Sequence, residues 1–504
     1  MKPTPTIILG PPGTGKTTRL LGLLQQMIEE GISPEDICFV SFTRKAAQEA
    51  RDRAKAKFNF EDKDLPNFRT LHSFAFHHLH VDKNQVMGFR SYIDICNMLG
   101  LTISTQRTEN DENFIKTHTK GDRLFFLENL ARSMNRTLDS VWRQFPNDDI
   151  SFPELELLAT TLREYKAARD KMDFTDMIIR FNELKSTPNF HALIVDEAQD
   201  MSPIQWDMVD LMSENSTKLI FAGDDDQAIY NWAGADVSRF LALSGDVEVL
   251  DYSYRVPKLI HEVAVKISGR IKNRKEKTYN TRNVDGSIVY HTELDTIDMS
   301  KGTWLLLARN QHLLMSYCGY CIRNAFLFES KQINRFDPAV IKVIKQWELL
   351  RTGARLPVEC VRDIYEYMAT KTRIKFGSKK QLDQLPDGLE VSIFDLQSNY
   401  GLQTTDVWHI ALNRIDPEQT QYYISALKRG EKMSVEPRIK ISTIHGAKGG
   451  EADNVVLYTD MSSRTYEEFE KNPDDEARVW YVAVTRAKHN LHLIQPLTTK
   501  FYEF

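Results

Sequence analysis

The sequence is poor in cysteine and has no long apolar segment. Its 504 residues include only five cysteines, too few for a disulfide-stabilised secreted scaffold and typical of a reducing compartment. Cys318 and Cys321 form a single CxxC pair in an apolar stretch. With no second pair to complete a zinc site, we expect a buried helix or strand there. No apolar run reaches the roughly 18–20 residues that cross a bilayer, and no signal peptide precedes the first predicted strand. We therefore expect a soluble, cytoplasmic protein with no membrane partner.

A strong net charge is also absent. The formal net charge is −5, so the chain lacks the overall positive charge common among nucleic-acid-binding proteins. Net charge does not report local placement, however, and a groove can hold a strand with few phosphate contacts. The densest basic run, residues 270–277, is predicted to be a solvated helix end, with a phosphate contact as the alternative.

Length and hydrophobic pattern indicate several α/β domains, since 504 residues exceed one ordinary core. Short β-branched runs, each followed by turn residues and a helical pattern, predict parallel α/β architecture. They lie at 6–9, 37–42, 192–195, 219–222, 247–250, 303–308, 454–458 and 490–494. Between 81 and 185 amphipathic helical segments dominate, for example 121–134 and 153–169, which predicts a helical insertion. A second mixed segment, about 311–437, separates the later strands.

A phosphate-binding loop is predicted at residues 10–17, where GPPGTGKT follows an apolar strand and opens a helix. Its glycines allow backbone N–H groups to close around phosphates, and the helix N-terminus favours negative charge. Lys16 is expected to reach the β- and γ-phosphates, and Thr17 to hold Mg²⁺. The predicted nucleotide contacts are Gly10, Pro11, Gly13, Thr14, Gly15, Lys16, Thr17 and Thr18, with Arg19 as a further one.

An acidic pair completes this chemistry. Residues 193–197 form an apolar strand that ends in Asp196 and Glu197, which places both acids at the carboxyl edge of a sheet, where α/β folds bind ligands. Asp196 suits Mg²⁺ coordination, and Glu197 suits polarisation of the attacking water.

Further motifs indicate a particular class of nucleotide hydrolase. They are FTRKAA at 42–47, TLHSF at 70–74, DFTD at 173–176, DEAQD at 196–200, FAGDDDQAIYNWAGA at 221–235, YSYR at 252–255, ISTIHGAKGGE at 441–451 and YVAVTRAK at 481–488. Together they resemble superfamily 1 helicases of the UvrD/Rep/PcrA type, over nearly the whole chain.

The resemblance implies an α/β fold with two RecA-like parallel-sheet motor domains of the P-loop NTPase class and helical insertions. The first motor domain (1A) would comprise residues 1–80 and 186–250, and its helical insertion (1B) residues 81–185. The second (2A) would comprise 251–310 and 438–504, with a reduced 2B-like subdomain and part of 2A at 311–437.

The resemblance also implies an ATP-dependent DNA helicase that uses ATP and Mg²⁺, moves 3′→5′ on single-stranded DNA and unwinds duplex. Gln227 would sense the γ-phosphate, and Arg255 and Arg486 would act as arginine fingers, which with Lys16 and Glu197 form the catalytic set. Tyr254 would stack on the adenine, and Glu451 would meet the ribose. Single-stranded DNA and single-strand/duplex junctions are the implied partners, with replication or repair proteins that the sequence does not identify. The small size suits a bacterial or phage enzyme.

For the strand itself, the aromatic and histidine side chains in these motifs match family positions that line the single-strand groove. Every base offers a π-face, so aromatic rings suit a sequence-independent motor. Trp232 is the expected stacking platform, and core packing is the alternative for each ring. The predicted strand contacts are Phe42, Thr43, Thr70, His72, Tyr230, Trp232, Thr443 and His445.

Two departures from the family pattern shape the expectations. Family members usually carry an upstream helix with an adenine-reading glutamine, whereas nine residues precede Gly10 here, so we expect a looser preference for ATP over other nucleotides. The interval between Arg255 and Ile441 is also shorter than usual, so we expect a reduced 2B-like subdomain. Because the sequence ends at Phe504, we also expect no nuclease domain.

Three alternatives stay open at this point. A nucleic-acid-stimulated NTPase could act as a clamp or protein-displacing translocase without processive unwinding. A motor of the RecD type would have 5′→3′ polarity, but its motifs differ from residues 223–230 here. An RNA motor would need a 2′-hydroxyl reader, and the sequence offers none that is recognisable.

Overall fold

The computed structural model describes residues 3–42, 44–104, 119–145, 149–330, 332, 336–337 and 339–504. The chain divides into two compact units. The first comprises Met1–Asp285 and Glu468–Thr485, and the second Gly286–Glu467 and Arg486–Phe504.

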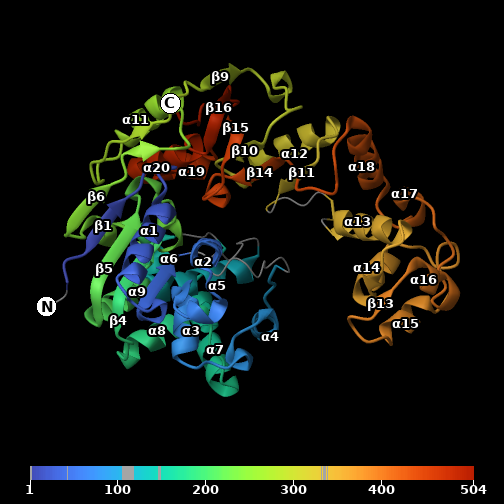
Figure 1. Cartoon of the computed structure of the whole chain (residues 1–504), viewed down its shortest axis with the longest axis horizontal. Helices are drawn as coiled ribbons and strands as arrows, with labels where there is room; N and C mark the ends of the chain where they lie inside the picture. Colours follow the sequence, from blue (N-terminus) through green and yellow to red (C-terminus); the bar gives the residue numbers. More distant parts are fainter. Residues whose placement is uncertain are drawn as a thin grey trace. The chain divides into compact units, whose positions relative to one another are not determined.

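The first unit is built on a six-stranded sheet in which every pairing is parallel. Its order is β3-β2-β4-β5-β1-β6, and Figure 1 labels β4, β5, β1 and β6 of this sheet. The strands are β1 (Thr6–Leu9), β2 (Ile37–Ser41), β3 (Phe68–Thr70), β4 (Phe190–Asp196), β5 (Ser216–Gly223) and β6 (Asp246–Val249). The carboxyl ends of β1, β4 and β5 therefore share one edge, and the loop after β1 with the start of the following helix carries most of the predicted nucleotide contacts.

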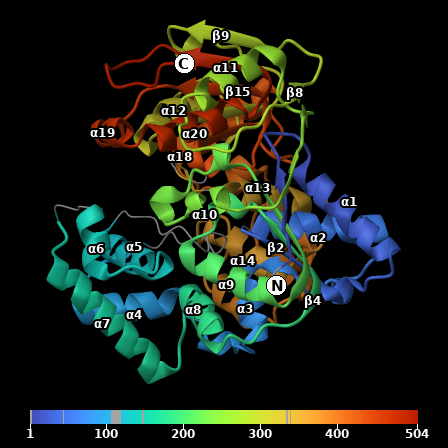
Figure 2. The same cartoon turned by 90° about the vertical axis from the view of Figure 1, so that its left-hand side faces the viewer.

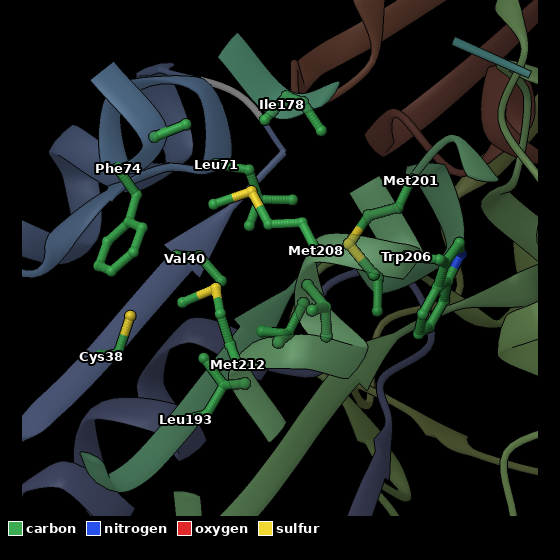
Figure 3. Packing of buried hydrophobic residues seen from close by; sticks show 14 of the residues in the cluster. Cys38, Val40, Leu71, Phe74, Ile178, Leu193, Met201, Trp206, Met208 and Met212 are labelled. Atoms are coloured by element: carbon green, nitrogen blue, oxygen red, sulfur yellow. The ribbon is translucent and has the colours of Figure 1, made fainter. Parts of the chain in front are cut away.

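Successive side chains of these strands pack into two different cores, because they point to opposite faces of the sheet. On one face, Ile8, Phe39 and Ile194 pack with α1 (Lys16–Glu29) and α2 (Arg44–Phe58). On the other, residues such as Val40 and Leu193 pack with α3 (Leu71–His78), α8 (Phe174–Leu184) and α9 (Pro203–Glu214), as Figure 3 shows. Near-continuous apolar strands of this kind are characteristic of parallel sheets covered on both faces.

A group of helices follows α3 in the chain. It contains α4 (Phe89–Leu99), α5 (Lys120–Ser133), α6 (Leu138–Gln144) and α7 (Phe152–Arg169), gathered beside α8 in Figure 2. The group has its own apolar core, with Ile95, Leu127 and Leu158 fully buried. The helices predicted at 121–134 and 153–169 are thus confirmed as α5 and α7.

An ionic cluster joins this group to α8. Arg132 of α5 lies 2.7 Å from Glu128 and from Asp173, and 2.9 Å from Asp176. Lys166 of α7 lies 2.5 Å from Asp173 and 2.7 Å from Asp176. Burial alone would raise the pKa of Asp173, but the two cations outweigh it and hold that pKa well below its usual value.

The first unit also includes α10 (Val237–Leu241), α11 (Lys258–Ser268) and the short parallel pair β7 (Tyr252–Ser253) and β8 (Asn280–Thr281). Helix α20 (Pro473–Val484) comes much later in the sequence but packs against α11. Every residue of α20 from Glu476 to Val484 is buried.

The second unit contains another six-stranded, all-parallel sheet, in the order β11-β14-β10-β15-β16-β9. Its strands are β9 (Ser287–His291), β10 (Trp304–Ala308), β11 (Phe328–Ser330), β14 (Ile439–Thr443), β15 (Ala452–Tyr458) and β16 (Ala487–Ile494). Helices α12 (Leu314–Arg323) and α19 (Ser463–Lys471) accompany it. Cys318 and Cys321 are buried in α12, which confirms the prediction of a buried element there. Two parallel sheets with flanking helices confirm the predicted α/β class.

A helical segment of the second unit has a separate core around Trp347, Val361 and Tyr365. It contains α13 (Ala339–Arg351), α14 (Val358–Glu366), α15 (Ser378–Asp383), α16 (Ile393–Asn399), α17 (Trp408–Ala411) and α18 (Pro417–Arg429). The segment also contains the antiparallel strand pair β12 (Leu356–Pro357) and β13 (Glu390–Val391). Across the parts of the chain that the structure describes, no helix is both long and apolar enough to cross a membrane.

Candidate nucleotide site and nucleic-acid interface

The predicted phosphate loop lies between β1 and α1. Gly13 has a φ of +72°, and a Cβ there would lie 2.4 Å from Cβ of Arg255, so no other residue fits without displacement. Helix α1 starts at Lys16, and within the described structure no side chain caps its N-terminus. Its first N–H groups are therefore available to an anion, which the helix dipole also favours.

Lys16 lies among carboxylates at the carboxyl edge of the sheet. Its Nζ is 3.0 Å from Oε1 of Glu197, and its side chain is 12% exposed. Burial alone would lower the pKa of Lys16, but Glu197, Asp224 and Asp196 outweigh burial and raise it. Lys16 is therefore held in its charged form beside the predicted base Glu197.

Asp196 and Thr17 are the residues predicted to hold Mg²⁺. Burial and the adjacent charge of Glu197 raise the pKa of Asp196 to about 7. A nearby cation would favour the charged form of this carboxylate. Thr17 is half-buried in the first turn of α1. Mg²⁺ favours hard oxygen ligands and commonly takes one or two from the protein, with phosphate and water completing the shell. Among the described residues no group of three or more His, Cys, Asp or Glu could hold a metal ion by itself.

Glu197 has an uncommon backbone conformation. Its φ is 55° and its ψ is 40°, in the left-handed region that non-glycine residues rarely adopt. Such conformations cost roughly 1–3 kcal/mol and cluster at functional sites. Oε2 of Glu197 accepts a hydrogen bond of 2.6 Å from Nε2 of Gln199, and the side chain is 26% exposed. An oriented carboxylate that water can reach is suited to general-base catalysis.

Gln227 is connected to the Glu197 carboxylate through Gln199 and Asp224. Oε1 of Gln199 accepts a 3.1 Å hydrogen bond from the N–H of Asp224, while Nε2 of Gln199 donates to Glu197. Oδ2 of Asp224 in turn accepts a 2.7 Å bond from Nε2 of Gln227. The predicted sensor and the predicted base are therefore linked by consecutive hydrogen bonds.

Tyr254 and Arg255 lie directly on the phosphate loop. The N–H of Tyr254 donates to the carbonyl of Gly13 at 2.9 Å, and Oγ of Ser253 donates to the carbonyl of Pro12 at 2.7 Å. The Tyr254 ring is 71% exposed, so it can stack on a nucleotide base. Arg19, also predicted as a nucleotide contact, makes two hydrogen bonds to Glu248, of 2.6 and 2.9 Å.

Arg486 and Glu451 belong to the second unit, where they lie on neighbouring segments. Nη1 of Arg486 donates to the carbonyl of Gly450 at 3.2 Å, and the carbonyl of Arg486 accepts from the N–H of Ala452. Glu451 pairs with Lys488 at 2.5 Å. The finger and ribose-binding roles of these two residues stay predictions.

The predicted strand contacts differ in how accessible they are. Trp232 is 41% exposed and stacks on Phe126 of α5, with ring centroids 6.1 Å apart. Phe42 and Tyr230 stack on each other at 5.6 Å and are 8% and 9% exposed. His72 is 5% exposed and meets Phe174 edge-on at 5.9 Å. Trp232 therefore offers the most accessible ring of these four.

Two of the predicted strand contacts, Thr70 and Thr443, have structural partners. Oγ1 of Thr70 caps α3 by accepting from the N–H of Ser73 at 3.2 Å. Thr443 ends β14, and its Oγ1 accepts from Nε2 of Gln332 at 2.8 Å. His445 opens the short 3₁₀ helix that follows. Thr43 lies outside the described residues.

Two cations of the basic run 270–277 differ from both predicted alternatives, whereas Arg270 and Lys272 are exposed, as predicted for a solvated run. Lys277 has a 1% exposed side chain and pairs with Asp224, Asp225 and Asp226. Arg274 makes two hydrogen bonds to Asp226. These two cations are thus neither solvated nor free for phosphate, because three buried carboxylates engage them. No local sequence pattern pairs the run with an acidic turn about fifty residues away.

Comparison with known proteins identifies the family. The model of the UvrD/REP helicase N-terminal domain matches residues 2–248, and that of the UvrD-like helicase C-terminal domain matches residues 412–497. The ATP-dependent DNA helicase PcrA of Staphylococcus aureus is 25% identical over 314 residues, which cover 58% of this chain and 42% of that protein. PcrA of Staphylococcus epidermidis is 26% identical with the same coverage. The chain thus spans less than half the length of these relatives. A solved complex of arterivirus nonstructural protein 10 (helicase) with DNA aligns over 98% of this chain and 62% of its own, but at 10% identity and a TM-score of 0.33.

Proposed function

The chain belongs to the UvrD/REP helicase family, and from that premise we propose that it is an ATP-dependent motor that moves 3′→5′ along single-stranded DNA and unwinds duplex. The observation that carries the proposal is the hydrogen-bonded series from Lys16 through Glu197, Gln199 and Asp224 to Gln227. The exposed ring of Trp232 lies five residues farther along the same loop.

In this proposal the site residues of the first unit have defined tasks. Lys16 neutralises the β- and γ-phosphates, and the uncapped N-terminus of α1 binds them through backbone N–H groups. Thr17 and Asp196 hold Mg²⁺, which would neutralise charge on the transferring phosphoryl group when bound. Glu197 accepts the proton of the attacking water.

The remaining tasks concern the base, the phosphoryl charge and the strand. Tyr254 stacks on the base, and Arg255, held against the phosphate loop, adds positive charge where the phosphoryl group is transferred. Trp232 stacks on a base of the strand. The roles of Arg486 and Glu451 in the second unit are carried over from the family resemblance.

The proposed division into subdomains has physical support as well. The helical insertion proposed for residues 81–185 has an apolar core that includes Ile95, Leu127 and Leu158. The reduced 2B-like subdomain proposed within 311–437 has another, from Leu327 to Met433. Separate cores favour separate folding units.

The test is ATP-dependent strand displacement on duplexes with a 3′ tail, a 5′ tail or no tail, beside ATP hydrolysis with and without single-stranded DNA. We expect DNA-stimulated hydrolysis and displacement of the 3′-tailed duplex alone. A Glu197→Gln variant, which keeps the shape of the side chain but removes its basicity, should bind DNA and displace nothing. Preference for the 5′ tail would refute the polarity. Stimulated hydrolysis with no displacement of any duplex would replace the helicase proposal with a clamp or protein-displacing translocase.

A further inference from the structure

Three consecutive carboxylates are buried in the loop after β5. Asp224, Asp225 and Asp226 are each 0% exposed, and with Gln227 they form what we call the acidic turn (residues 224–227). Buried carboxylates are costly unless cations and hydrogen-bond donors compensate them. The side chains that compensate these three therefore decide whether the turn keeps its shape.

Two cations from the basic run supply the compensation. Nζ of Lys277 lies 3.2 Å from Asp224, 2.7 Å from Asp225 and 3.0 Å from Asp226. Arg274 donates from Nε and Nη2 to the two oxygens of Asp226, at 2.8 and 2.5 Å. Burial alone would lower the pKa of Lys277, but the three carboxylates outweigh burial and raise it. Three negative and two positive charges nearly balance, so loss of either cation leaves the cluster strongly unbalanced.

On one side, the acidic turn is bonded to the nucleotide site. Asp224 shares its carboxylate between Lys277 and Gln227, with Nε2 of Gln227 2.7 Å from Oδ2. Its N–H donates to Gln199, which donates to Glu197, the partner of Lys16. Three consecutive contacts therefore connect Lys16 to Asp224.

On the other side, the acidic turn is bonded to the segment that carries Trp232. Nε of Arg478, on α20, donates to the carbonyl of Asp225 at 2.9 Å. Nη1 of Arg478 also donates to Oδ1 of Asp475 at 3.1 Å, and the same oxygen accepts from Nδ2 of Asn231 at 2.7 Å. Asn231 immediately precedes Trp232, so the turn and the exposed ring are held by one network.

We propose that Lys277 and Arg274 are positioning residues that fix the acidic turn between the nucleotide site and the Trp232 segment, and so couple strand binding to hydrolysis. Neither residue touches nucleotide or strand in this proposal. Both act through Asp224 and Asp226. The proposal rests on the proposed function, because it needs a motor whose hydrolysis is stimulated by single-stranded DNA.

The experiment compares Lys277→Met with Lys272→Met. Both remove one positive charge from the same run, but Lys272 has an exposed side chain and contacts Asp474 through its backbone N–H. The readout is the ratio of ATP hydrolysis with saturating oligo-dT to hydrolysis without DNA, together with oligo-dT affinity. We expect Lys277→Met to lower the ratio by about 3- to 30-fold, the range typical of residues that carry coupling between sites. Lys272→Met should keep the parent ratio and affinity.

Two conservative variants distinguish a role in coupling from a purely structural role. Lys277→Arg keeps the charge and should recover most of the ratio. Arg274→Lys also keeps the charge balance, and hence the fold, but cannot make both hydrogen bonds to Asp226. We expect it to lower the ratio by about 2- to 10-fold at an unchanged melting temperature.

The outcomes separate this inference from the proposed function. A folded Lys277→Met protein with the parent ratio would overturn the inference. So would an unfolded Lys277→Met protein together with an Arg274→Lys protein of parent ratio, because the cluster would then serve stability alone. Equal loss of oligo-dT affinity in Lys277→Met and Lys272→Met would also overturn it, in favour of a phosphate-binding run. If the parent protein shows no DNA stimulation at all, the proposed function itself fails.

Discussion

Replacing Lys16 by alanine should separate catalysis from folding. Lys16 contributes one donor and one positive charge to the proposed phosphate site, and removal of one such preorganised donor typically costs about 10²–10³-fold in rate. We therefore expect the rate of DNA-stimulated phosphate release to fall by at least about 10²-fold.

The structural cost of the same change should be small. Breaking a fully buried ion pair costs about 3–5 kcal/mol, but Glu197 is 26% exposed and keeps its hydrogen bond from Gln199. Water can therefore hydrate the carboxylate that Lys16 leaves, and we expect a loss of about 1–2 kcal/mol, or a few degrees in melting temperature.

The assay pairs phosphate release at saturating ATP with thermal melting followed by circular dichroism. Lys258→Ala is the matched control, because Lys258 likewise opens a helix and forms an ion pair, with Asp285 at 3.4 Å, yet is 49% exposed. The control should hydrolyse at the parent rate. Hydrolysis by Lys16→Ala within tenfold of the parent would refute the phosphate site, and loss of the folded signal would show that the lysine is a structural residue instead.

Four other expectations follow from exposure and charge. Trp232→Ala should weaken oligo-dT binding by about 1–3 kcal/mol in fluorescence anisotropy, and Phe126→Ala should weaken it less, because Phe126 supports the ring. His72→Ala should lower the melting temperature and leave oligo-dT affinity unchanged, since His72 is 5% exposed; a loss of affinity would contradict this. Hydrolysis of ATP and GTP at saturating DNA should differ little, because the exposed Tyr254 ring stacks on either base; a strict preference for ATP would contradict this. Burial and a neighbouring histidine lower the pKa of His492 to about 4. The unfolded chain therefore binds a proton that the folded chain does not, and stability should fall by about 1–2 kcal/mol, after allowance for solvent screening, as pH drops from about 6.5 towards 4. Urea midpoints at pH 7 and 5 measure this, and His492→Asn should shift less.

Elements defined by local pattern could be predicted from the sequence. The strands at 6–9, 192–195 and 454–458 all lie within observed strands, since each is an apolar run bounded by turn residues. The phosphate loop and the acidic pair were also identifiable, because their chemistry depends on residues a few positions apart. The structure brings Lys16 within 3.0 Å of Glu197, although the two are 181 positions apart in the sequence.

Contacts between distant segments could not be predicted in this way. A run with five cations in eight residues normally indicates a solvated surface, and only the fold reveals that Lys277 faces three buried aspartates. The burial of His72 has the same origin. Its motif matches a strand-contacting position, but its side chain faces Phe174 of α8, a contact that depends on how α3 and α8 pack.

The orientation of Trp232 illustrates how a motif depends on a segment outside it. Gly234 has a φ of +93°, and a Cβ there would lie 2.9 Å from Cδ1 of Leu130 and 3.1 Å from Cγ of Met134. Phe126, Leu130 and Met134 recur every four residues, so they share one face along α5 and its C-terminal end, and Phe126 stacks on the Trp232 ring. The turn that presents Trp232 is therefore shaped by a helix of the proposed insertion. Helix α5 also carries Arg132, whose ion pairs reach Asp173 and Asp176 at the start of α8, so the helix that supports the stacking ring is attached to α8 by charged side chains. A change in that attachment should therefore alter strand affinity even where no strand-contacting residue is replaced.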